Sequence, residues 1–192
     1  MATLVTLAAA CADSELGPPE PDPLGSRDGC ALIDLADSGH LLTASQAQFI
    51  VQSLGQMTAI LGVGGEVRLS VVADAAMVEL HAEFSGDAST TDVLTFDLSE
   101  GQAAATRQLD VDIYTCFDEA VRQGAARGHA PERELLLYAI HGVLHCLGFD
   151  DHSDDQYAAM HAKEDELLAA IGLPATFKAG DSAAGSNGGG AS

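Results

Sequence analysis

The chain has 192 residues, enough for one globular domain with a hydrophobic core but too few for two once its ends are set aside. Hydrophobic residues make up 47% and charged residues 19% of the sequence, which excludes global disorder, and no apolar run is long enough for a membrane span. Only 8 Lys and Arg stand against 29 Asp and Glu, so the net charge of -21 repels phosphate backbones. Any contact with nucleic acid must therefore depend on a local site.

Hydrophobic periodicity divides the middle of the chain into strands and helices. Four segments have strand patterns: 31–36, 66–73, 93–98 and 109–114. Five segments have helical spacing: 43–61, opened by Thr43 or Ser45 as its cap; 74–84, capped by Asp74; 116–126; 131–147; and 154–171. Glycines at 62, 64 and 65 end the first of these helices.

The order of these elements predicts the fold class. The polar segment SEGQAAATRQ is short enough for the strands on either side of it to pair antiparallel, as in a hairpin. We therefore expect an α+β fold, with a small mixed four-stranded sheet packed with four to five helices and a metal site at the end of a central helix.

The two ends of the chain differ in composition from its middle. Residues 12–29 hold four of the six prolines, and residues 180–192 are small and polar. These compositions predict a flexible leader over 1–29, one folded domain over 30–177 and a disordered tail over 178–192.

The most informative segment is HGVLHCLGFDDH, residues 141–152, at the end of the apolar helix 131–147. His141 and His145 are four residues apart, so their imidazoles lie on one helix face and can reach a common Zn²⁺ ion. Gly148 stops the helix, after which Asp151 or His152 can turn back as a third ligand. The pattern predicts one zinc ion held by His141, His145 and Asp151 (or His152), with a fourth position left for water.

Other interpretations of this segment remain open. The two histidines could be hydrogen-bonded core residues, and Asp150 could either orient a ligand imidazole or cap the turn after Gly148. Cys146 points about 100° away from His145 around the helix, so we expect it in the core. A zinc peptidase of the H-E-x-x-H type is disfavoured, because glycine stands at position 142 in place of the general base.

The same segment resembles the signature H-G-x-L-H-L-x-G-Y-D-H of the YbeY family of bacterial rRNA maturation factors, matching at both histidines, both glycines, Leu144 and Asp150. TDVLTF at 91–96 is similar to the family's T-D-V-L-S-F strand, and 109–113 stands in the place of its L-G-D-I strand. The resemblance covers residues 31–173. It implies a zinc-dependent endoribonuclease, directed at single-stranded RNA, that acts in rRNA maturation, including 16S 3′ end processing, and in ribosome quality control.

Three features depart from the family's pattern. Asp151 occupies the place of the family's third His ligand, with His152 one residue late. His81 and Ser85 stand where family members carry Asn-x-x-Tyr-Arg, so the Arg that would face phosphate is missing. Basic residues are also few near the motif, although Arg122 and Arg127 could form a small patch.

These features lead to one expected function and two rivals. We expect hydrolysis of an RNA phosphodiester, with an rRNA precursor and the small ribosomal subunit as implied partners and no membrane. The rivals are a zinc hydrolase acting on peptides or small molecules, and a non-catalytic ribosome-assembly factor in which the metal only stabilises the fold. The sequence assigns no general base and no oligomeric state. Four cysteines without C-x-x-C spacing fit reduced thiols, which favours the cytoplasm.

Overall fold

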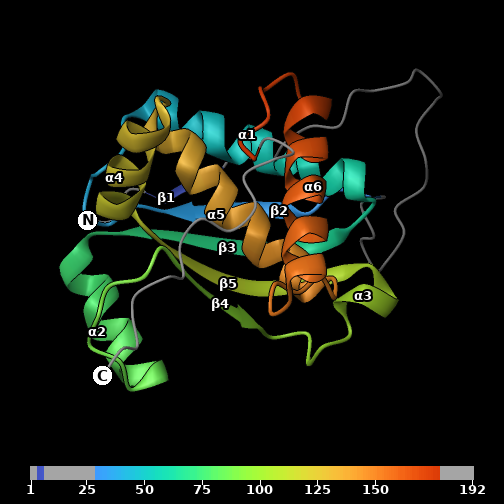
Figure 1. The fold of residues 1–192 in the computed structure, drawn as a ribbon, viewed down its shortest axis with the longest axis horizontal. Coiled ribbons are helices and arrows are strands. Elements are labelled where there is room, and N and C mark those ends of the chain that lie inside the picture. Colours follow the sequence, from blue (N-terminus) through green and yellow to red (C-terminus); the bar gives the residue numbers. More distant parts are fainter. Residues whose placement is uncertain (1–3, 7–28, 178–192) are drawn as a thin grey trace, which may run out of the picture.

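The computed structural model describes residues 4–6 and 29–177 (Figure 1). The elements follow in the order β1 (Leu4–Thr6), β2 (Leu32–Ala36), α1 (Ala44–Leu61), β3 (Gly64–Val72), α2 (Asp74–Ser85), β4 (Val93–Asp97), α3 (Ala103–Thr106), β5 (Gln108–Cys116), α4 (Phe117–Arg127), α5 (Pro131–Cys146) and α6 (Asp154–Ala170). Most of the predicted leader and the whole predicted tail lie outside the described residues, so the domain limits stay a prediction.

The strands form one mixed sheet in the order β1-β2-β3-β5-β4. β2, β3 and β5 run parallel, and β4 pairs antiparallel with β5, as the polar connection between them predicts. The mixed sheet of four predicted strands and the α+β class are confirmed. β1 adds a short antiparallel edge to β2 from within the range predicted as leader, and the short helix α3 lies in the connection between β4 and β5.

Helices cover one face of the sheet much more fully than the other. In Figure 1, α1, α4, α5 and α6 lie on one side of the strands and α2 lies on the opposite side. The alternation along β5 explains the difference, since Leu109, Val111 and Ile113 are buried while Asp110 is exposed and Asp112 half-buried. The hydrophobic core therefore lies between the sheet and the layer that α1 and α5 form.

Local sequence signals place the ends of the helices. Thr43 caps α1 in a capping box with Gln46, and Gly62 ends the helix in the left-handed conformation. The prediction that Asp74 caps α2 is wrong by one residue, because Ala73 is the cap and Asp74 is the first helical residue. Arg122 binds the Asp74 carboxylate. The free N–H of Asp74 is bound by the carboxylate of Asp118, which accepts it at 2.8 Å.

Helix α5 is the central helix of the domain, and residues all around it are buried. Cys146 at its end is 7% exposed, and burial raises the pKa of its thiol to about 12, which confirms that it is a core residue. Met57, Met77 and Met160 are fully buried, as expected of core methionines. Within residues 4–6 and 29–177, no helix combines the length and the apolar character that crossing a bilayer requires.

Candidate metal site

The histidines of α5 face each other across a short gap. The Nε2 atoms of His141 and His145 are 3.0 Å apart, as the helical spacing of four residues predicts. Two nitrogens bound to one tetrahedral zinc ion at about 2.0–2.1 Å are separated by roughly 3.3 Å. The two imidazoles are therefore already close to the separation that a shared ion requires.

The other nitrogen of each ring is held by an oxygen atom. His141 Nδ1 lies 2.8 Å from Glu164 Oε1, and His145 Nδ1 lies 3.1 Å from the carbonyl oxygen of Phe149. A carbonyl oxygen and an ionised carboxylate can accept a hydrogen bond but cannot donate one. Each Nδ1 must therefore be the donor. In the neutral rings the Nε2 atoms then carry lone pairs, and these face each other.

The facing lone pairs provide a test of whether this donor set fits a metal ion. Two acceptor nitrogens at 3.0 Å repel each other unless a proton or a cation lies between them. Neutral imidazole with its Nδ1–H fixed by a second group is also the usual form of a histidine ligand. The arrangement of the two rings therefore fits a divalent cation such as zinc.

Asp151 approaches the same point from the turn after α5. Its Oδ2 lies 3.7 Å from His141 Nε2, and its Oδ1 lies 4.0 Å from His145 Nε2. Gly148, at φ +90°, lets the chain reverse after the helix, as expected. The structure thus brings His141, His145 and Asp151 together as a group that could hold a metal ion.

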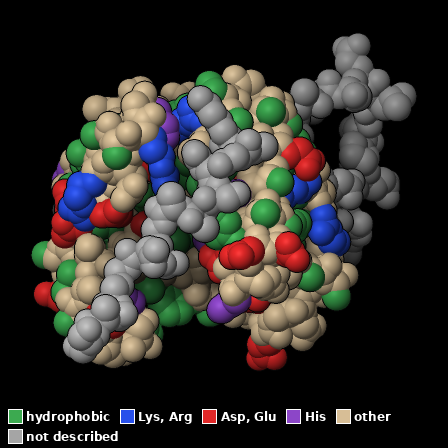
Figure 2. Space-filling view, viewed as in Figure 1, with side chains coloured by type: hydrophobic (Ala, Val, Ile, Leu, Met, Phe, Trp, Pro, Cys, Tyr) green, Lys and Arg blue, Asp and Glu red, His purple; other side chains and the backbone are tan. Residues whose placement is uncertain are grey.

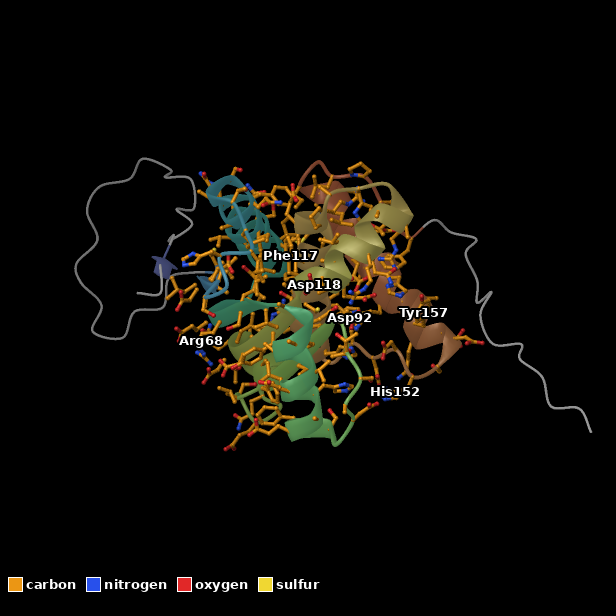
Figure 3. The ribbon with its side chains drawn as sticks, turned by 90° about the vertical axis from the view of Figure 1, so that its left-hand side faces the viewer. Arg68, Asp92, Phe117, Asp118, His152 and Tyr157 are labelled. Carbon is orange, nitrogen blue, oxygen red and sulfur yellow. The ribbon has the colours of Figure 1, made fainter. Side chains whose placement is uncertain are left out.

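His152, the alternative third ligand, lies elsewhere. Its side chain is 83% exposed and its Nδ1 contacts the carboxylate of Asp150, which also accepts the backbone N–H of Asp151. Figure 3 shows His152 at the outer edge of the molecule, apart from Asp92 near its centre. Asp150 therefore holds the turn and the exposed His152 ring, and neither residue joins the group around His141.

Glu164 of α6 connects two histidines inside the domain. The carboxylate is 2% exposed and binds His141 Nδ1 at 2.8 Å and His161 Nδ1 at 2.6 Å. Burial alone would raise the pKa of Glu164, but the two hydrogen bonds outweigh it and hold that pKa below its ordinary value. Burial likewise opposes protonation of His141, yet the bond to Glu164 and the nearby carboxylates raise the pKa of His141. Glu164 is therefore an ionised anchor that fixes the orientation of His141.

Gly142, between the two histidines in the motif, packs directly on the sheet. A Cβ atom at this position would lie 2.4 Å from Thr95 Oγ1 and 3.2 Å from a methyl carbon of Ile113. The close approach of α5 to β4 and β5 thus excludes any larger side chain here. The carboxylate that an H-E-x-x-H peptidase places at this position has no space in this fold.

A cavity of about 300 Å³ opens beside the three candidate ligands. Its walls come from several elements of the fold and are listed here: Asp92, Val93, Arg127, Leu137, Tyr138, His141, Asp151, Tyr157, His161, Glu164 and Phe177. Figure 3 shows two of them, Asp92 from the loop before β4 and Tyr157 from α6. The cavity is large enough for about one small ligand or one nucleotide.

His81, Arg122 and Arg127 do not meet at the cavity. His81 does not line it, and its Nδ1 lies 2.9 Å from the carbonyl of Ser89. Arg122 binds Asp74 and Glu119, whereas Arg127 binds Glu134, so the two arginines form separate ion pairs. On the face in Figure 2, basic side chains are likewise scattered among acidic ones. Of the two, only Arg127 lines the cavity.

Sequence reasoning missed Glu164, although the sequence carries a signal for it. Met160, Glu164, Leu167 and Leu168 follow the spacing of an apolar helix face, and all four are buried. A glutamate in such a stripe indicates a buried carboxylate with a dedicated partner. Glu134 was missed in the same way. It lies on α5 one turn before Tyr138 and two turns before His141, so it shares their helix face.

The fold and the site together define the class of this protein as an α+β domain with a candidate His-His-Asp metal site open to a cavity. Comparison with known proteins gives the family. Residues 38–172 match the family described as Endoribonuclease YbeY, and the chain belongs to this family. The resemblance read from the two sequence motifs is thereby confirmed.

Curated relatives agree with this assignment. The chain is 32% identical to an endoribonuclease YbeY of Pelotomaculum thermopropionicum, over 76% of this chain and 93% of that protein. It is 34% identical to one of Halalkalibacterium halodurans, over 73% and 96% of the two chains. The solution structure of TM1509 from Thermotoga maritima matches with a TM-score of 0.50 and 24% identity, over 73% of this chain and 91% of that one, which supports the fold.

Proposed function

We propose that this protein is a zinc-dependent endoribonuclease whose ion is held by His141, His145 and Asp151. One observation carries the metal assignment: both Nδ1 atoms are fixed as donors, so two Nε2 lone pairs face each other 3.0 Å apart beside a carboxylate. Membership of the endoribonuclease YbeY family supports RNA as the substrate. The acidic third ligand supports zinc as well as a histidine would, because Zn²⁺ accepts nitrogen and carboxylate oxygen at similar distances.

The residues of the chain have distinct tasks in this proposal. A zinc ion held here would supply Lewis acidity, which makes water a nucleophile at neutral pH and polarises a scissile phosphate. Glu164 and the carbonyl of Phe149 keep the two imidazoles in the tautomer that can bind the ion. The cavity beside them receives one nucleotide of the RNA strand, and Leu137, Tyr138 and Glu164 are the buried part of its wall.

Within this function, we propose an rRNA precursor as the RNA, maturation of the 16S 3′ end and ribosome quality control as the process, and the small ribosomal subunit as a partner. The resemblance of residues 141–152 and 91–96 to the family's motifs supports this narrower assignment. A cytoplasmic place of action follows from the same proposal. The packing of Gly142 against Thr95 argues against the peptidase rival, because it removes the space for that general base.

The test is cleavage by the purified full chain after zinc loading, with metal content measured by mass spectrometry. We expect one zinc per chain and cleavage of single-stranded RNA that stops when a chelator removes the metal. A casein panel run in parallel should stay intact. Intact RNA together with cleaved casein would overturn the proposal in favour of a peptidase. Intact RNA and intact casein with bound zinc would instead favour the non-catalytic assembly factor.

A further inference from the structure

We propose that Arg127 binds a phosphate group of the RNA strand in the cavity. This inference rests on the proposed function, because it concerns how the same site holds its substrate. It assigns a substrate-binding role to a residue of α4 that lines the cavity, whereas Ser85 at the end of α2 does not line it.

The cavity is acidic and needs a cation to accept RNA. Asp92, Asp151 and Glu164 line it, and a phosphate group there would meet their negative charges. Among the described residues that line the cavity, Arg127 is the single Lys or Arg. A metal ion would offset part of the negative charge, and Arg127 adds a fixed positive charge on the wall that α4 provides.

The other basic side chains of the described residues have partners elsewhere. They form the following contacts: Arg68 with Glu66, Asp110 and Asp112; Arg107 with the carbonyl of Leu61; Arg122 with Asp74 and Glu119; Arg133 with Pro174 and Thr176; and Lys163 with Glu166. None of these five residues lines the cavity. Arg127 therefore lies at the cavity, whereas the other five described basic residues do not.

The guanidinium of Arg127 is oriented by its neighbours but keeps N–H donors available for a ligand. Its Nη1 donates to Glu134 Oε2 at 2.8 Å, and Glu134 is fully buried, which fixes the direction of the group. The Cζ atom of Arg127 lies over the Phe177 ring, 5.7 Å from the centroid. The Arg127 side chain is still 38% exposed, and a guanidinium has five N–H donors in a fork that matches a phosphate.

A second polar group in the cavity wall has no hydrogen-bond partner. Tyr138 is 6% exposed and lines the cavity, and its buried hydroxyl is unpaired among the described residues. A buried hydroxyl without a partner costs stability, so a polar ligand in the cavity would satisfy it. Arg127 and Tyr138 therefore both favour an anionic, hydrogen-bonding ligand at this place.

The test measures binding of the zinc-loaded full chain to a fluorescent single-stranded RNA 8-mer with hydrolysis-resistant linkages, by anisotropy from low to moderate salt. Arg127→Gln should weaken binding about tenfold, the loss of one charge-assisted contact. It should also reduce the slope of log affinity against log salt by about 0.7, the value for one phosphate on a single strand. Arg127→Lys should keep the slope and lose part of the affinity.

Arg122→Gln is the matched control, because it removes the same charge from the same helix but outside the cavity. It should leave affinity and slope unchanged. Arg127→Gln leaves the buried Glu134 carboxylate with only His129 Nε2, at 3.0 Å, beside it. The double variant Arg127→Gln with Glu134→Gln removes both charges and keeps the test valid if the single variant unfolds. With cleavable RNA, we expect KM to rise and kcat to change little.

The inference is overturned if folded Arg127→Gln, or the double variant, binds RNA with the affinity and salt slope of Arg122→Gln. That result differs from failure of the proposed function, in which the unmodified protein itself neither binds nor cleaves RNA. A drop in affinity without a change in salt slope would also overturn it, because a structural role of Arg127 would not alter the number of phosphate contacts.

Discussion

Two histidine–carboxylate pairs lie between residues 141 and 164, and they differ in burial. His141 binds Glu164 inside the domain, where Glu164 is 2% exposed and also holds His161. His152 binds Asp150 at the surface, where the imidazole is 83% exposed. The chemistry of the two pairs is the same, but solvent screens the second and not the first.

The difference supports our proposal that His141 is a zinc ligand. Glu164 fixes the ring of His141 with a charge-assisted hydrogen bond in a buried setting, so the free nitrogen has one direction. The exposed His152 can rotate and exchange its partner for water. The same comparison supports Asp151 as the proposed third ligand, because its carboxylate lies 3.7 Å from His141 Nε2 while His152 is not part of that group.

The largest expected effect is that of His145→Ala. Removing one of two facing nitrogens should reduce bound zinc from one ion per chain to almost none and abolish RNA cleavage. The fold should survive, since His145 is partly exposed and α5 is held by its apolar residues. Metal content and a circular-dichroism melt check both statements, and collapse of the fold would instead indicate a metal that staples the structure.

A matched pair of substitutions tests the role of burial directly. Glu164→Gln should lower zinc affinity about 10- to 100-fold, the usual effect of removing a carboxylate that orients a histidine ligand. His141 and His161 bind different oxygens of Glu164. In Gln one of these oxygens becomes an NH2 group, which is a donor, so one Nδ1–H loses its acceptor. Asp150→Asn removes the same charge from the exposed pair and should leave zinc affinity unchanged. Competition with a chromogenic chelator measures the zinc affinity of both variants. Equal losses of zinc affinity would contradict the claim that burial distinguishes the two pairs.

The stability of the metal-free protein should depend on pH through the buried pair. The pKa of Glu164 is lowered from 4.5, so its contribution is full above that pH and is lost as pH falls through the lowered value. The pKa of His141 is raised from 6.5, so its contribution is full below that pH and is lost as pH rises through the raised value. Chelator-treated protein should therefore melt at a lower temperature on either side of the interval between 4.5 and 6.5.

Thermal melts across pH 4 to 9 check this profile, and Glu164→Gln should flatten it on both sides. An unchanged profile in that variant would show that other groups cause the pH dependence. In zinc-loaded protein the alkaline loss should disappear, because the ion takes the place of the proton on His141.

The smallest effect is expected for His152→Ala. An exposed imidazole outside the ligand group should change neither zinc content nor the melting temperature measurably. Asp151→Asn is the comparison, and it should weaken zinc binding clearly because a neutral amide is a poorer ligand than a carboxylate. If His152→Ala released the ion and Asp151→Asn did not, the third ligand would be His152.

The sequence was a good guide wherever the signal is local. The spacing of His141 and His145, the stop at Gly148 and the capping residue Thr43 follow from helix geometry, and the structure places them accordingly. The contacts of Glu164 and Arg127 join residues far apart in the chain, so no local pattern could give their partners. The need for glycine at 142 likewise comes from strand β4.

Zinc-edge anomalous scattering from crystals of the zinc-loaded chain tests the central claim most directly. We predict a single strong peak within bonding distance of His141 Nε2, His145 Nε2 and an Asp151 oxygen, with His152 outside that distance. A map in which those two nitrogens bind no common ion, or in which the ion lies between Asp150 and His152, would contradict the account.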